Sequence, residues 1–133
     1  IRDYAKRFDI NDSMPRVLAM ALGAGETSLM RLTSAYAMLV NGGKRIEPVF
    51  IDRIQDRYGH TLYRHDERAC VGCNAEQWLG QAAPDLLDER AQVISPQTAY
   101  QVVSMLEGVV KRGTGRRISS IGKPLAGKTG TTN

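Results

Sequence analysis

The residues best suited to chemistry lie in the segment Lys128-Thr129-Gly130-Thr131, near the end of the printed sequence. Lys128 carries a positive charge, and the two threonines carry hydroxyl groups. Gly130 has no Cβ, so the backbone of a ligand could lie against the chain there. The main-chain N–H of Thr131 could stabilise a developing oxyanion, and one such donor contributes about 3 kcal/mol to transition-state stabilisation. We therefore expect Lys128 and Thr131 to be catalytic and residues 128–131 to bind a substrate carboxylate; the alternative is a surface strand of small residues without a role.

Residues 122–129 also fit the phosphate-loop pattern G-x-x-x-x-G-K-[ST]. A phosphate loop leaves a buried apolar strand and enters a helix whose N–H groups hold the phosphate. Residues 116–121 do not form an apolar strand, and Pro124 removes one N–H from the loop. Gly130 and Thr131 have low helix propensity, so no helix is expected to follow. The sequence therefore supports a nucleotide-binding function only weakly.

Three segments with apolar residues at helical spacing should position this end of the chain. Residues 1–8 predict a short amphipathic helix. Residues 28–40 predict a mostly buried helix, with Thr27 as its N-cap and a stop at Asn41-Gly42-Gly43. A third helix begins at Ser95-Pro96, with Ser95 as its N-cap and Pro96 in its first turn, and continues to about residue 111.

Strand patterns occupy two other segments. Residues 47–64 alternate in polarity around the turn Tyr58-Gly59-His60, which predicts a β-hairpin. Residues 125–131 predict a further strand. Between them, residues 66–90 are polar and irregular, as in a surface excursion. Helices combined with a hairpin indicate an α+β fold.

Composition restricts the partners of the chain. Its 18 Lys and Arg residues against 14 Asp and Glu residues give a formal net charge of +4. The basic cluster at residues 111–117 is short and contains no aromatic side chain, which argues against nucleic-acid binding. No apolar run approaches the roughly 18 residues of a membrane span, and no signal peptide is visible. We therefore expect no membrane span within these residues.

Several segments, in the same order along the chain, resemble the transpeptidase domain of class A penicillin-binding proteins. They are Tyr4–Phe8, Met20–Thr27, Leu32–Gly43, Ser104–Val110, Arg112–Gly115 and Lys123–Asn133. Lys-Thr-Gly is one of three sequence signatures of this group of enzymes, beside Ser-x-x-Lys and Ser-x-Asn. The resemblance implies an incomplete fragment of a β-lactamase/DD-transpeptidase-like domain. It would span residues 1–133, be truncated at both ends and carry a variable excursion at 66–90.

The resemblance also implies a function for the longer parent protein. The parent would bind penicillin and cross-link peptidoglycan stem peptides through an acyl-serine intermediate. It would need no cofactor or metal, and it would be anchored on the periplasmic side of the bacterial inner membrane, where other cell-wall proteins are further potential partners. Lys128, Thr129 and Thr131 would bind the terminal carboxylate of the stem peptide or of a β-lactam.

The nucleophilic serine of this family is expected upstream of residue 1. The chain has one Ser-x-x-Lys, at residues 120–123, and no Ser-x-Asn. A nucleophile of this type must share a helical face with its lysine, and Gly122 and Pro124 argue against a helix here. We interpret the pattern as chance and expect the chain to be inactive by itself. A non-catalytic interaction module remains the alternative function.

Cys70-Val71-Gly72-Cys73 is compatible with several states. A zinc site would need further ligands, and His60 and His65 have an unsuitable order and spacing. A redox-active pair usually begins a helix after a strand, a context that is missing here. Inert thiols are the next alternative. If the parent works outside the cytoplasm, a Cys70–Cys73 disulfide is favoured, because oxidising compartments preserve such bonds.

Overall fold

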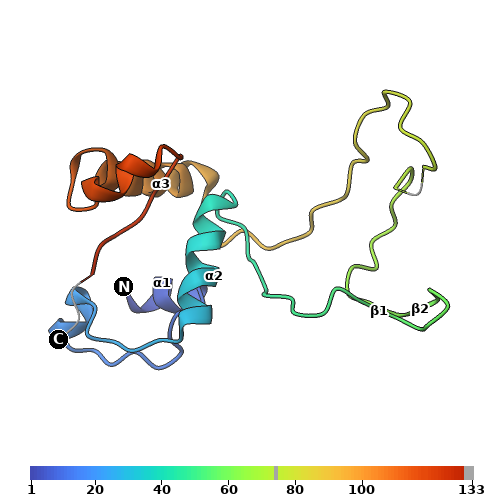
Figure 1. The fold of residues 1–133 in the computed structure, drawn as a ribbon. Coiled ribbons are helices and arrows are strands. Elements are labelled where there is room, and N and C mark those ends of the chain that lie inside the picture. Colours follow the sequence, from blue (N-terminus) through green and yellow to red (C-terminus); the bar gives the residue numbers. More distant parts are fainter. Residues whose placement is uncertain (74, 131–133) are drawn as a thin grey trace. The chain divides into compact units, whose positions relative to one another are not determined.

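A computed structural model describes residues 1–73 and 75–130 of the chain. The chain separates into two units, of which the first consists of Ile1–Ile46 together with the residues from Arg90 onward. The second unit is Glu47–Glu89. Figure 1 labels three α-helices, all in the first unit, and two strands, both in the second. Helices together with a small antiparallel sheet agree with the predicted α+β class.

The helices of the first unit lie close to their predicted positions. Each of the three predicted α-helices is present, and two short 3-10 helices accompany them. The elements are α1 (Arg2–Arg7), η1 (Leu18–Leu22), α2 (Leu29–Val40), α3 (Pro96–Arg112) and η2 (Arg116–Ile121).

The N-cap of α2 differs from the prediction by one residue. Ser28 has an extended backbone, and its side chain accepts a hydrogen bond of 3.2 Å from the N–H of Arg31. Thr27 instead donates its hydroxyl to the carbonyl of Ile10 at 2.6 Å, which connects the start of α2 to the segment that follows α1. The prediction of Thr27 as the cap was therefore wrong, because a neighbouring residue of similar chemistry takes the position. The predicted cap of α3 is confirmed, since Ser95 accepts from the N–H of Thr98.

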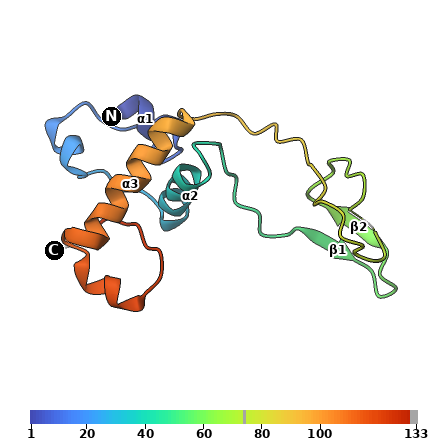
Figure 2. The ribbon, with the colours of Figure 1, turned by 90° about the horizontal axis from the view of Figure 1, so that it is seen from above.

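A small apolar core holds the first unit together. It combines the end of α1, the second half of α2 and the beginning of α3, and Figure 2 shows α3 lying across α2. Its members are Phe8, Ala35, Met38, Ile94 and Ala99. Met38 is 1% exposed and is the largest fully buried side chain of the described residues.

The prediction that α2 is mostly buried was wrong for this chain. Among its residues only Ser34, Ala35 and Met38 are buried, whereas Leu29 is 81% exposed and Val40 74% exposed. The apolar arc of α2 is wider than the face that the described residues cover. The uncovered part is therefore apolar surface in contact with solvent.

A junction around Gly43 joins the two chain segments of the first unit by hydrogen bonds, near the residues at which the chain enters and leaves the second unit. The N–H of Gly43 donates to the carbonyl of Met38 at 2.9 Å, and the carbonyl of Gly43 accepts from Val93 at 2.8 Å. Lys44 and Gln92 then form an isolated antiparallel bridge. The two ends of the intervening segment are thus hydrogen-bonded to each other.

The second unit contains the predicted β-hairpin. Strands β1 (Arg53–Gln55) and β2 (Thr61–Arg64) pair in antiparallel fashion, with Ile54 opposite Tyr63. The hairpin prediction is confirmed, although residues 47–52 lie outside the first strand. All strand residues are exposed, so neither face of the hairpin is buried within the described residues of this unit.

Asp56 organises the turn of the hairpin. Its carboxylate accepts hydrogen bonds from the N–H groups of His60 at 2.9 Å and Tyr58 at 2.8 Å, and His60 Nδ1 lies 2.9 Å away. These contacts, led by the N–H of His60, hold the pKa of Asp56 below its usual value. An aspartate that bonds its own turn backbone explains the tight connection between the strands.

Within the described residues, the part of the second unit outside the hairpin contains neither helix nor strand. Asp66 and Arg68 form an ion pair of 2.6 Å, and the hydrogen bonds from Arg68 hold the pKa of Asp66 well below its usual range. Arg68 also donates to the carbonyl of Leu87 at 3.2 Å. This guanidinium therefore joins the two ends of the irregular segment.

Candidate functional site

The site begins at the C-terminal end of α3, where two glycines form a tight turn. The N–H groups of Gly113 and Gly115 both donate to the carbonyl of Val109, at 3.1 and 3.0 Å. A Cβ at Gly113 would lie 3.0 Å from Val109 Cα, and one at Gly115 would lie 3.3 Å from Val109 O. Glycine at both positions therefore allows the turn to pack against the helix. Thr114, between them, is exposed.

The segment that follows the turn does not form a serine–lysine pair. The 3-10 helix η2 ends before Gly122, which has a left-handed backbone with φ of 68°. Ser120 lies inside η2 and donates its hydroxyl to the carbonyl of Arg117 at 3.1 Å. Lys123 follows the helix, so Ser120 and Lys123 do not share a helical face. This geometry is unlike the helical pair that a nucleophile of this type requires.

The predicted strand at residues 125–131 is absent from the part that the structure describes, residues 125–130. A strand needs a neighbour to which its N–H and C=O groups can bond. In the described chain the N–H of Gly127 bonds instead to the carbonyl of Leu106 in α3, at 3.2 Å. The prediction was wrong here because the sequence pattern contained no information about a pairing partner.

Lys128 and Thr129, two of the predicted site residues, are in contact. Lys128 Nζ donates to the carbonyl oxygen of Thr129 at 2.7 Å and lies 3.3 Å from its Oγ1. Thr129 Oγ1 lies 2.8 Å from the Oγ1 of Thr114. Both predicted residues are exposed, so the ammonium and hydroxyl groups are accessible to a ligand. Thr131, the other predicted catalytic residue, lies outside the described residues.

Sequence reasoning did not identify Thr114 as part of this site. Thr114 and Thr129 are 15 residues apart, and a separation of that size has no local periodicity that could reveal it. The available signal was the segment Arg112–Gly115, one of the segments that carry the family resemblance.

Gly130 has no structural requirement within the described residues. A Cβ there would meet no described atom within 4 Å, and its φ lies outside the left-handed region. The local fold would therefore accept a side chain at this position. The space beside Gly130 is compatible with a ligand lying along the backbone.

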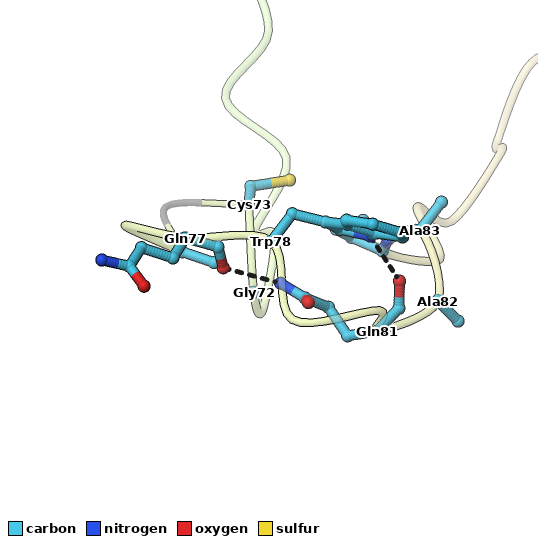
Figure 3. A pocket seen from close by; sticks show the side chains of 9 residues that line it. Gly72, Cys73, Gln77, Trp78, Gln81, Ala82 and Ala83 are labelled. Atoms are coloured by element: carbon cyan, nitrogen blue, oxygen red, sulfur yellow. Dashed lines mark hydrogen bonds between the residues drawn. The ribbon is translucent and has the colours of Figure 1, made fainter.

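Cys70 and Cys73 form a disulfide, with their Cα atoms 5.5 Å apart. Among the described residues no group of three or more His, Cys, Asp or Glu side chains could hold a metal ion. Cys73 also lines a shallow pocket of about 430 Å³ in the second unit, shown in Figure 3. There Trp78 Nε1 donates to the carbonyl of Gln81 at 3.2 Å, yet Trp78 is 79% exposed.

Reduction of this disulfide should increase the fluorescence of Trp78. Trp78 is the single tryptophan of the chain, and it lines the same pocket as Cys73. A nearby disulfide quenches indole emission, and its reduction also removes the constraint on the loop. Emission of the 133-residue chain is measured while a phosphine reductant is added. A variant with both Cys70→Ser and Cys73→Ser is the control, and its emission should not change when the reductant is added. Equal emission before and after reduction of the unsubstituted 133-residue chain would contradict the expectation.

Comparison with known proteins identifies the class to which this arrangement belongs. Residues 9–133 match the family model described as "Penicillin binding protein transpeptidase domain". The chain therefore belongs to the transpeptidase-domain family of penicillin-binding proteins. The resemblance drawn from the separate segments is thereby confirmed.

Individual relatives agree with this family. Over 135 residues the chain is 44% identical to penicillin-binding protein 1A of Rickettsia bellii (strain RML369-C), covering 100% of the chain and 17% of that protein. Identity and coverage are the same for penicillin-binding protein 1A of Rickettsia prowazekii (strain Madrid E). For penicillin-binding protein 1A of Neisseria lactamica, identity is 38% over 134 residues, covering 99% of the chain and 15% of that protein. The chain thus spans only a small part of the length of these relatives.

The two alternative functions are not supported. Family membership favours neither a separate interaction module nor a nucleotide-binding protein. In residues 122–129 the phosphate-loop letters follow a 3-10 helix rather than a buried strand. A search of the described residues also finds no helix with the length and apolar character of a membrane span.

Proposed function

We propose that this chain is the substrate-anchoring part of a peptidoglycan DD-transpeptidase with a β-lactamase-like domain. The observation that carries the proposal is the exposed contact between Lys128 and Thr129 beside an open Gly130, in a chain that belongs to the transpeptidase family. The ammonium of Lys128 attracts a carboxylate, and the hydroxyl of Thr129 can donate to it. Thr131 is proposed to supply a further hydroxyl and an oxyanion N–H.

In the proposed reaction, a serine outside these residues attacks the carbonyl carbon of the penultimate D-alanine of a stem peptide. The peptide bond breaks, the terminal D-alanine leaves as an amine, and an acyl-serine ester remains. The leaving nitrogen takes up the proton of the serine hydroxyl. An amino group of a second stem peptide then attacks the ester carbonyl, the ester C–O bond breaks as a new amide forms, and a proton from the attacking amine passes to the serine oxygen. Penicillin acylates the same serine, but its ester is stable.

The role of this chain in that reaction is to hold the anionic end of the ligand. A bound carboxylate places the scissile carbonyl at a fixed distance from the serine, and such positioning is a major part of catalysis. The same residues would hold the carboxylate of a β-lactam. We also propose that the longer protein is anchored on the periplasmic side of the inner membrane, through segments outside these residues, and meets other cell-wall proteins there.

Labelling with a fluorescent penicillin tests this function. The 133-residue chain should remain unlabelled, whereas the longer protein should be labelled on a serine outside residues 1–133, because the nucleophile is proposed to lie there. Gel fluorescence measures the labelling, and mass spectrometry of the digest locates the adduct. An adduct on Ser120 would show that the Ser-x-x-Lys pattern had been wrongly dismissed, and an unlabelled longer protein would refute the transpeptidase proposal.

A further inference from the structure

The hydroxyl of Thr114 reaches the site from a different element of the chain. It lies 2.8 Å from the hydroxyl of Thr129, although 15 residues separate the two. The glycines on either side of Thr114 pack against Val109, so the backbone of Thr114 is held against the end of α3. The segment that carries Thr129 is attached to the same helix, because the N–H of Gly127 donates to the carbonyl of Leu106.

Either hydroxyl can donate in the contact between Thr114 and Thr129, and the direction of that hydrogen bond decides where the proton of Thr129 points. A threonine oxygen has one proton and can accept two hydrogen bonds. Lys128 Nζ has no acceptor capacity and lies 3.3 Å from Thr129 Oγ1, so it can occupy only an accepting position of that oxygen. If Thr114 donates as well, both accepting positions are filled. The proton of Thr129 is then left available to a further acceptor, such as an oxygen of a bound ligand.

We propose that Thr114 is a positioning residue that donates its hydroxyl proton to Thr129 and thereby directs the proton of Thr129 toward the carboxylate of the substrate. This inference rests on the proposed transpeptidase function. Thr114 itself does not touch the ligand in this arrangement. Its contribution should therefore appear only with ligands that present an anionic oxygen to Thr129.

The inference is tested in the longer protein with two probes, a β-lactam with its free carboxylate and the methyl ester of the same compound. Thr114→Val should lower the second-order rate of acylation by the free acid about tenfold. This is the size expected if the hydrogen bond from Thr129 to the ligand carboxylate is lost, because its hydroxyl proton is no longer directed there. The ester lacks the anion, so its slower acylation should change by less than about twofold. The ratio of the two rates is the measured quantity.

Two further variants separate a positioning role from a packing role. Thr114→Ser keeps the hydroxyl and should retain the ratio of the parent, whereas Thr114→Ala removes the hydroxyl without the bulk of valine and should lower the ratio as valine does. Equal loss with acid and ester in both hydroxyl-free variants would overturn the proposal, because such a loss reports general disruption. Acylation rates that stay unchanged with both probes in both variants would also overturn it.

Failure of the inference about Thr114 can be distinguished from failure of the proposed function. Lys128→Ala is measured with the same two probes. If it leaves acylation by the free acid intact, the carboxylate-binding role of this end of the chain is wrong. If it abolishes that acylation while Thr114→Ala and Thr114→Val have no effect, the function stands and the role of Thr114 is refuted.

Discussion

Replacing Lys128 by alanine in the longer protein should lower the rate of acylation by penicillin about 100-fold, the lower end of the range for losing a preorganised electrostatic contact in an active site. The physical reason is the role proposed for Lys128, in which its ammonium group supplies the positive charge for the ligand carboxylate. Its removal also leaves Thr129 without the donor that now contacts its carbonyl and hydroxyl oxygens. Time-resolved labelling with fluorescent penicillin measures the rate.

A matched control separates this local effect from the loss of a charge in general. Lys123→Ala removes the same side chain five residues earlier in the segment and should change the rate by less than about twofold, as expected for a surface charge. Undiminished capture of penicillin by Lys128→Ala would refute the carboxylate-binding role. An equal loss in both variants would show that net charge, rather than position, governs the reaction.

The largest expected effect on stability is at Gly43, in the junction that closes the first unit. A Cβ at this position would overlap the carbonyl oxygen of Ile94 and lie 2.9 Å from Ile94 Cγ1. Gly43 also has φ of 81°, which L-residues rarely adopt. Gly43→Ala should therefore lower the free energy of unfolding of the 133-residue chain by about 3 kcal/mol, the sum of backbone strain and overpacking. Circular dichroism during urea denaturation measures the change.

Gly42 provides the control for that experiment. Its φ is 67°, so alanine there meets the same kind of backbone strain, but no described atom lies within 4 Å of the added Cβ. Gly42→Ala should therefore lower the free energy of unfolding by only about 1 kcal/mol. If both variants lose the same amount, the clash with Ile94 has no energetic consequence, and the importance assigned to the Gly43 junction would be wrong.

Local sequence signals predicted most of the secondary structure. Helical spacing and a capping serine with proline were sufficient for α3, and the turn residues were sufficient for the hairpin. The N-cap of α2 is Ser28 rather than the predicted Thr27, an error of one residue at the boundary of a correctly predicted helix. Adjacent residues with equivalent capping chemistry differ only in where the backbone leaves the extended conformation, and this boundary is difficult to predict from sequence.

Tertiary relationships could not be predicted in the same way. Periodicity shows that α2 has a wide apolar arc, but not which part of that arc another element covers, so the exposure of Leu29 and Val40 was missed. The pattern of residues 125–130 is compatible with a strand, but a strand forms only where another strand pairs with it. Thr114 was missed for a related reason, since its partner Thr129 is brought near it only by the folding of the chain around α3.

The Lys44–Gln92 bridge has a consequence for the evolution of the chain. Since the two ends of the intervening segment are held together, insertions or deletions within residues 47–89 need not alter the path of the backbone through the helical core. Loop closure becomes only slowly less favourable as a loop lengthens, so such changes of length are inexpensive. This part of the chain can therefore diverge between lineages while the helices that hold residues 127–130 keep their packing.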